Sequence, residues 1–428
     1  MRFYSTGGDS SFVGFKDALF QGLAPDGGLF MPENIPLLGK DFFKTDLTYP
    51  ELAAEMIKPF VSGDLSNQQI DEIAELAFDF PIPIAQVNES DYIMELFHGP
   101  TLAFKDFAAR FMARTMAMLL ENENRELTIL VATSGDTGSA VANGFLGLEG
   151  IKVVILYPSN RVSVIQEKQL TTMGRNITAL EVNGSFDDCQ KMVKQAFLDN
   201  ELTESRFFSS ANSINIGRLL PQSVYYAWAW KQAEEPKVFS VPCGNFGNLT
   251  GGLLAKRMGL PIEKFIAATN ANDVFPKYLR GCEVTTERAK QTLSNAMDVS
   301  VPSNLVRIKK LYNNEVDQIK SDIISWSFSD DETKRTIEKL KEEANYLTDP
   351  HTAVGVLGLK KYRVETGSMQ KGIVLSTAHP GKFAEVVEPI IKEKIDLPDP
   401  LQSVLNKEKQ AITIRNQYSD LKEFLMES

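Results

Sequence analysis

One lysine of this chain has the surroundings expected of a nucleophile. Lys105 stands at the predicted start of a helix, in the segment Gly99-Pro-Thr-Leu-Ala-Phe-Lys-Asp-Phe. The positive end of a helix dipole and an apolar setting both disfavour an ammonium group, so both lower the pKa of this amine. A neutral lysine amine forms imines with aldehydes. The alternative is an ordinary lysine whose alkyl chain covers apolar surface while its ammonium reaches water.

A glycine-rich turn is the second candidate for chemistry. The turn Cys243-Gly-Asn-Phe-Gly-Asn follows the apolar run Val238–Pro242 and precedes a predicted helix at Leu249–Met258. Gly244 and Gly247 permit backbone conformations in which successive amides point at an anion. The turn has neither the Lys-Ser or Lys-Thr pair of a nucleotide-binding loop nor the spacing of the dinucleotide fingerprint. A single phosphate monoester therefore fits it better, and a tight turn without a ligand is the alternative.

Two further polar turns follow apolar runs. In Thr133-Ser-Gly-Asp-Thr-Gly, the hydroxyls of Ser134 and Thr137 suit a carboxylate. However, Asp136 and Thr137 could equally be a helix cap. The turn Ser210-Ala-Asn-Ser-Ile-Asn-Ile-Gly-Arg ends in Arg218, and arginine binds phosphate in a bidentate manner but more often forms a surface ion pair.

The elements that must position these turns alternate between strand and helix. This order is typical of βαβ units, which have parallel strands and right-handed crossovers. Ligands of such sheets bind beyond the carboxyl ends of the strands, where the polar turns stand. We therefore expect an α/β protein with helices on both faces of mostly parallel sheets. The predicted strands are Leu127–Thr133, Lys152–Tyr157, Val238–Pro242, Phe265–Thr269 and Gly372–Ser376.

Composition excludes several classes of protein. The formal net charge of -11 makes nucleic acid an unexpected partner, because binding to a phosphate backbone needs clustered cations. No apolar run approaches the roughly 18 residues of a membrane helix, and the N-terminus lacks the layout of a secretory signal. The three cysteines and three histidines have no metal-ligand spacing, so we expect no metal site. An odd number of scattered cysteines indicates reduced thiols and a cytoplasmic location.

The chain resembles the threonine synthase family, whose members are fold-type II enzymes that use pyridoxal 5'-phosphate. The resemblance covers nearly the whole chain, and the lysine segment and the block Ser294–Ser300 are specific to this family. It implies two open, mostly parallel twisted sheets flanked by helices, with an N-terminal helical region and an added helical lobe. The segments that carry it are Gly22–Phe30, Glu95–Phe107, Ser294–Ser300 and Thr377–Phe383.

The expected domains follow from this layout. Residues 1–90 are expected to form a mainly helical region, and residues 91–212 a smaller α/β domain with the cofactor lysine and the substrate-carboxylate turn. Residues 213–428 are expected to form a larger α/β domain with the cofactor-phosphate loop. This domain includes a polar helical insertion near 275–347, whose function the sequence does not reveal.

The resemblance implies a role for each candidate residue. Lys105 would hold the cofactor as a Schiff base and move protons, and Thr377 would face the pyridine nitrogen. Asp136 is assigned to cofactor binding near the ring oxygen, although many fold-type II relatives have an asparagine there that binds this oxygen. The cofactor phosphate would be held by Gly244, Asn245, Phe246, Gly247 and Asn248, the substrate carboxylate by Ser134 and Thr137, and the substrate phosphate by Asn212, Ser213 and Arg218.

The implied reaction converts O-phospho-L-homoserine and water to L-threonine and phosphate, by γ-elimination and β-hydration. One alternative is a related fold-type II lyase, such as a phospho-lyase or a dehydratase. Another is a non-catalytic relative that binds phosphorylated metabolites. The sequence reveals neither the oligomeric state nor any allosteric control.

Overall fold

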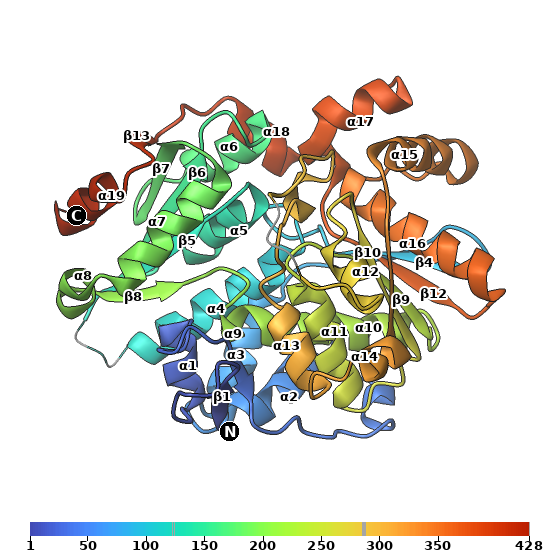
Figure 1. Cartoon of the computed structure of the whole chain (residues 1–428), viewed down its shortest axis with the longest axis horizontal. Helices are drawn as coiled ribbons and strands as arrows, with labels where there is room; N and C mark the ends of the chain where they lie inside the picture. The colour runs from blue at the N-terminus through green and yellow to red at the C-terminus, as the bar shows by residue number, and fades with distance from the viewer. Residues whose placement is uncertain (122, 124, 285–287, 428) are drawn as a thin grey trace.

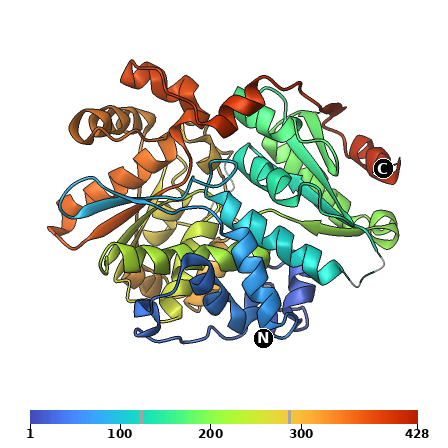
Figure 2. The same ribbon diagram turned by 180° about the vertical axis from the view of Figure 1, so that it is seen from behind.

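The apolar runs of the sequence form the buried strands of two open sheets, shown from opposite sides in Figures 1 and 2. The computed structural model describes residues 1–427 except 122, 124 and 285–287. The larger sheet has six strands in the order β11-β10-β9-β12-β4-β3, and all its pairs are parallel except β3 with β4. Its strands are β3 (Ile84–Gln86), β4 (Asp91–Glu95), β9 (Val238–Pro242), β10 (Lys264–Thr269), β11 (Ile323–Ser327) and β12 (Gly372–Ser376).

The second sheet has five strands in the order β13-β7-β6-β5-β8, and every pair is parallel. Its strand β5 is buried at every position, as expected for a parallel strand covered by helices on both faces. The five strands are β5 (Leu127–Ala132), β6 (Ile151–Pro158), β7 (Ile177–Asn183), β8 (Phe207–Ser210) and β13 (Ile412–Arg415). Two short strands, β1 (Phe3–Ser5) and β2 (Phe30–Pro32), form a separate antiparallel pair.

Helices cover both sheets and join them. In Figure 1 the N-terminal helices, in blue, lie along one side of the molecule, beneath the space between the two sheets. This part contains α1 (Phe15–Gln21), η1 (Phe42–Lys44), α2 (Tyr49–Val61) and α3 (Asn67–Ala77), and the cyan helix α4 (Lys105–Leu120) lies above it in the middle of the molecule. The smaller sheet is accompanied by α5 (Asp136–Phe145), α6 (Val164–Thr171), α7 (Phe186–Leu198), α8 (Asn200–Ser205), α18 (Asp399–Leu405) and α19 (Tyr418–Glu427).

The remaining helices belong to the side of the larger sheet. The helix α16 packs directly on β9, β10 and β12, and its glycines allow this close approach. These helices are α9 (Ile216–Leu219), η2 (Leu220–Ser223), α10 (Val224–Gln232), α11 (Gly247–Arg257), α12 (Val274–Leu279), η3 (Asn295–Met297), α13 (Leu305–Leu311), α14 (Val316–Asp322), α15 (Asp330–Ala344), α16 (Pro350–Thr366), η4 (Pro380–Phe383) and α17 (Ala384–Ile391). In the described part of the chain, none of the helices is both long enough and apolar enough to cross a bilayer.

The predicted fold class is confirmed. Each of the five predicted strands exists, and Val238–Pro242 and Gly372–Ser376 agree with the observed strands at both ends. Strands with mixed or exposed patterns, such as β7, β8 and β13, were not predicted, since their positions depend on pairing with distant parts of the chain rather than on local hydrophobicity.

Two strands pair in the sheet that was not expected for their segment. Strand β4 pairs with β12 in the larger sheet, although residues 91–212 were expected to form the smaller domain. Strand β13 pairs with β7 in the smaller sheet, although it lies near the C-terminus. The expected helical lobe at 275–347 also supplies β11, which pairs with β10, so this lobe is partly built into the sheet. Within that lobe, residues 285–287 lie outside the described residues.

Candidate active site

Lys105 is the first residue of α4, as predicted, and a short pairing between two chain segments sets its position. The amide of Phe104 donates to the carbonyl of Thr377 at 2.9 Å, and the amide of His379 donates to the carbonyl of Leu102 at 3.0 Å. Leu102 takes a left-handed backbone conformation with φ of 58°, which bends the chain from this pairing into the helix. The start of α4 is thereby tied to the segment that follows β12.

A buried carboxylate closes the turn before the lysine. Asp106 accepts hydrogen bonds from the amide of Thr101 at 2.8 Å and from its hydroxyl at 2.6 Å. Burial raises the pKa of Asp106 to about 6 despite these bonds. A Cβ at Gly99 would lie 2.6 Å from Oδ2 of Asp106, so only glycine fits there without displacing the carboxylate.

Lys105 lines a cavity of about 880 Å³ between the two sheets. Burial lowers the pKa of its amine to about 8, and the charges of Arg218 and Lys382 act in the same direction, while Asp136 opposes them. The amine is therefore neutral in a far larger share of molecules than an ordinary lysine would be near neutral pH. This is the property that imine formation requires.

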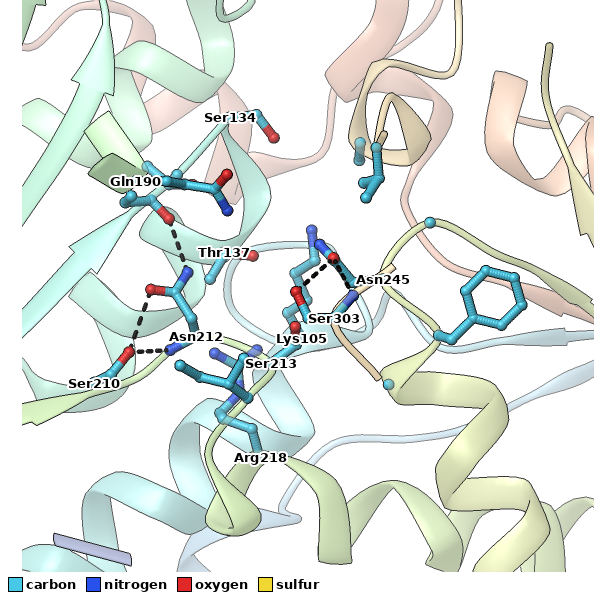
Figure 3. Close-up of a pocket in the computed structure, with 18 of the residues that line it drawn as sticks. Lys105, Ser134, Thr137, Gln190, Ser210, Asn212, Ser213, Arg218, Asn245 and Ser303 are labelled. Carbon is cyan, nitrogen blue, oxygen red and sulfur yellow. Dashed lines mark hydrogen bonds between the residues drawn. The ribbon is translucent and has the colours of Figure 1, made fainter. Parts of the chain in front are cut away.

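Every site residue predicted from the sequence lines this same cavity. The residues come from segments after β4, β5, β8, β9 and β12, so the carboxyl ends of strands from both sheets meet there. Figure 3 shows Lys105 between the Asn245 side and the side of Ser134, Thr137 and Asn212, with Arg218 beneath Ser213. The lining includes Lys105, Ser134, Asp136, Thr137, Asn212, Ser213, Arg218, Gly244, Asn245, Phe246, Gly247, Asn248 and Thr377.

The glycine-rich turn has the backbone geometry of an anion cradle. Phe246 adopts a left-handed conformation with φ of 62° immediately before α11, so the chain turns sharply into the helix start. A Cβ at Gly244 would lie 2.9 Å from both the carbonyl oxygen of Ala296 and the Cα of Met297. Glycine at position 244 therefore permits direct packing of the backbone of residues 296–297 against the turn.

Two buried hydrogen-bond donors beside the cavity bear on whether phosphate groups would fit there. The side-chain oxygen of Asn248 accepts two hydrogen bonds, one from the hydroxyl of Tyr225 and one from that of Tyr226, each at 2.7 Å. Within the described residues, the Nδ2 of Asn248 and the Nε of Arg218 are buried without a hydrogen-bond partner. Unpaired buried donors are rare and call for a ligand or water. The donor set therefore fits a phosphorylated cofactor at 244–248 and a second anion near Arg218.

Arg218 is almost fully buried, at 3% exposure, instead of lying on the surface. Its Nη1 donates to the carbonyl of Ala211 at 2.5 Å. Burial lowers the pKa of Arg218 to about 10, and the guanidinium still carries its charge at neutral pH. The surface ion pair that was the alternative for this residue is thus excluded.

The Asp136 side chain is held by groups of the protein itself. Its Oδ1 lies 2.9 Å from the ammonium of Lys382 and accepts a hydrogen bond from Gln166, also at 2.9 Å. Burial favours the neutral acid, but the charges of Lys382 and Lys105 outweigh it and keep the pKa of Asp136 well below its ordinary value. Asp136 is therefore ionised. The N-cap position of α5 is Gly135, which has no side chain, so Asp136 is the first residue inside the helix and not its cap.

The residues that connect the turn at 244–248 with the turn at 212–213 were not among those predicted from the sequence. Asn304 donates through Nδ2 to the carbonyls of Asn245, at 3.0 Å, and of Ser213, at 3.3 Å. Arg307, fully buried, donates to the carbonyls of Phe30 and Ile214 at 2.9 and 2.7 Å. Only the polar pair Ser303-Asn304 at the start of a helix hinted at them, and nothing in the sequence placed that helix near either turn.

A buried histidine supports the family-specific block at 294–300. His351 pairs through Nδ1 with Asp349 at 2.8 Å, and its Nε2 accepts from the amide of Ala296 at 3.2 Å. This arrangement holds the segment Asn295–Val299 as one wall of the cavity. The sequence singled out the block, but it could not show that the block covers the glycine-rich turn.

Comparisons with known proteins match the whole chain. The family model described as "Pyridoxal-phosphate dependent enzyme" matches residues 84–377. The models described as "Threonine synthase N terminus" and "Threonine synthase, C-terminal" match residues 2–78 and 352–425.

Individual relatives agree over their full length. A threonine synthase of Buchnera aphidicola subsp. Acyrthosiphon pisum is 42% identical over 436 residues, covering 100% of both chains. The crystal structure of threonine synthase from Escherichia coli has a TM-score of 0.93 at 40% identity and covers 100% of both chains. A PLP-bound threonine synthase structure from Brucella melitensis has a TM-score of 0.93 at 34% identity, covering 100% of this chain and 99% of the other.

We expect Gly244→Ala to weaken binding of pyridoxal phosphate by about tenfold or more, because the new methyl group must displace rigid backbone at 296–297. Titration of the apoprotein with the cofactor, followed by visible absorbance, measures the dissociation constant. Gly63→Ala is a control, since a Cβ there would meet only the Met1 nitrogen at 3.8 Å. Equal affinity in both variants would contradict the packing argument.

We expect the rate at which the apoprotein captures pyridoxal phosphate to follow the neutral fraction of Lys105. Because the pKa is lowered to about 8, the rate should rise with pH and level off above that value. Below it, each unit of pH should lower the rate about tenfold. Stopped-flow absorbance across this range measures the profile. A midpoint near that of an ordinary lysine would contradict the role of burial.

Proposed function

The chain belongs to the threonine synthase family of pyridoxal-phosphate-dependent lyases, and from this premise we propose that it converts O-phospho-L-homoserine and water to L-threonine and phosphate. In this proposal Lys105 carries the cofactor, and the turn at 244–248 binds the cofactor phosphate. The second anion position, at Asn212, Ser213 and Arg218, binds the phosphate of the substrate.

One observation carries the proposal: the glycine-rich turn at the start of α11 and the buried guanidinium of Arg218 line the same cavity as Lys105, an amine of lowered pKa. The cofactor has a single phosphate, which the glycine-rich turn and the start of α11 accommodate. Arg218 is a separate buried cation with an unpartnered Nε. A dehydratase acting on an unphosphorylated amino acid has no use for a second buried phosphate donor. The geometry therefore favours a phosphorylated substrate.

When bound, pyridoxal phosphate supplies an electron sink that makes protons next to the amino-acid nitrogen removable. Lys105 then serves as the base and acid of the site. Its amine, with a pKa of about 8, takes a proton from the α- or β-carbon and returns one to the γ-carbon. Because a group with a pKa of about 8 is about half protonated at pH 8, the amine can both accept and donate a proton there without a large energetic penalty.

Arg218 acts on the group that leaves. Its buried guanidinium stabilises the charge that develops on the departing phosphate, and burial strengthens this interaction. Asn212 donates its Nδ2 to the carbonyl of Ala132 at 2.8 Å, and this hydrogen bond fixes Asn212 between the ends of β5 and β8.

After the phosphate has left, water adds at the β-carbon of the substrate.

The remaining polar groups orient the ligand. Ser134 and Thr137, next to the start of α5, bind the substrate carboxylate, where the helix dipole favours an anion. Thr377 binds the pyridine nitrogen as a neutral partner. Its backbone carbonyl is occupied by Phe104, so this residue is tied directly to the lysine segment.

We also propose a cytoplasmic location. Cys189, Cys243 and Cys282 are free, and the first two are buried. Unpaired cysteines are common in proteins of reducing compartments.

We expect Lys105→Ala to lose both phosphate release from O-phospho-L-homoserine and the visible absorption of the lysine-bound cofactor. The loss of turnover should be at least about a thousandfold, because the same amine binds the cofactor and transfers protons. A malachite-green phosphate assay and an absorbance spectrum measure the two effects. Lys360→Ala, at an exposed position of α16, is the control. Phosphate release by Lys105→Ala at the wild-type rate would exclude this function.

We expect Arg218→Gln to lower kcat/KM for O-phospho-L-homoserine by about 10- to 100-fold, since a charged hydrogen bond to the phosphate is lost. Product inhibition by inorganic phosphate should weaken in parallel. Affinity for the cofactor, measured at a pH above the titration midpoint of Lys105, should change far less, because Arg218 is assigned to the other anion. Arg415→Gln removes a surface ion pair with Asp420 and is the matched control. If cofactor affinity alone fell, the assignment of the two anion positions would be wrong.

A further inference from the structure

A buried ion pair lies at the wall of the cavity that Lys105 lines, because Asp136 lines the same cavity. The ammonium of Lys382 lies 2.9 Å from Oδ1 of Asp136, and the side chains are 0% and 5% exposed. Lys382 also donates to the carbonyl of Thr101 at 2.8 Å, and Gln166 donates to the same Asp136 oxygen at 2.9 Å. Burying two charges is expensive, so such a pair persists only with close geometry and further hydrogen bonds.

The pair joins elements of both sheets at the site. Asp136 begins α5, which follows β5 of the smaller sheet, and Lys382 lies in η4, which follows β12 of the larger sheet. The hydroxyl of Ser163, at the start of α6, donates to the carbonyl of Lys382 at 3.3 Å. Asp136 is part of the cavity wall together with Lys105.

We propose that Lys382 is a positioning residue of this site: it fixes the place and the ionised state of the Asp136 carboxylate, and the two charges together set the protonation of Lys105. This inference rests on the proposed role of Lys105 as the reactive amine. A purely structural link between the two sheets would need no carboxylate in the cavity wall.

The charges around Lys105 act in opposite directions on the pKa of its amine. Burial lowers the pKa of the amine to about 8, Asp136 raises it, and both Arg218 and Lys382 lower it further. Lys382 thus acts on the amine directly, and it also acts indirectly by keeping Asp136 charged. The titratable and cationic groups that line the cavity or lie behind it are Lys105, Asp106, Asp136, Lys194, Arg218, Cys243, Asp298, His351 and Lys382.

Removing one charge of the pair at a time gives shifts of opposite sign. In Asp136→Asn an anion is lost, so the protonated amine is less stable and the titration midpoint of Lys105 falls. In Lys382→Met a cation is lost while the charge of Lys105 still favours the ionised form of Asp136, so the midpoint rises. Each shift should be about one pH unit, and the midpoint of the double variant should return close to that of the wild type.

The experiment titrates Lys105 in the apoprotein. Acetic anhydride labels neutral amines, and peptide mass spectrometry gives the labelling rate of Lys105 at each pH. Circular dichroism and thermal melting confirm that each variant is folded. If Lys382→Met alone fails to fold, Asp136→Asn is compared with the double variant, and removal of Lys382 in that background should still raise the midpoint.

Lys256→Met is the matched control, because it breaks the Lys256–Asp322 pair of 2.8 Å, whose residues do not line the cavity. It should leave the Lys105 midpoint unchanged. Shifts of the same sign in both single variants, or no shift in either, would overturn the proposal. Because the labelling needs neither substrate nor turnover, the shifts can appear even if the chain releases no phosphate from O-phospho-L-homoserine, and that result would contradict only the proposed reaction.

Discussion

The site depends on the pairing between residues 102–104 and 377–379. Two backbone hydrogen bonds and the left-handed turn at Leu102 tie the start of α4 to the segment after β12. Without this pairing, Lys105 would be the first residue of an ordinary helix. With it, the lysine faces the carboxyl ends of strands from both sheets, and the groups assigned to the cofactor ring and to its aldehyde belong to one rigid unit.

The electrostatics of the cavity differ from those of the chain as a whole. The formal net charge is -11, yet the cavity gathers cations and donors in a small volume. Arg218 and Arg307 are both buried, and the described contacts of Arg307 are backbone carbonyls and the side-chain oxygen of Asn304. Their charges are only partly offset locally, because Asp136 is already paired with Lys382. A surplus of positive charge at the wall of a cavity favours phosphorylated ligands over neutral ones.

The segment at 275–347 contributes to the cavity through its position in the fold. Its residues 295–299 form one wall of the cavity, held by His351, while Asn304 bridges the turns at 213 and 245. Strand β11 ties the same segment into the larger sheet. This region is therefore part of the site and part of the core, and its polar composition reflects hydrogen bonds to the backbone of other segments as well as exposure to water.

The sequence alone determined the strands with continuous apolar runs, the turns that follow them and the place of Lys105 at the start of a helix, because local hydrophobicity, glycine conformation and helix polarity act over a few residues. It could also rank the residues of the glycine-rich turn and Arg218 as candidates. Only the tertiary structure decided that Arg218 is buried, that Asp136 is paired with Lys382, and that β4 and β13 lie in the sheets opposite to expectation. Those facts depend on contacts between residues hundreds of positions apart, where burial and charge are set by partners that no local pattern identifies.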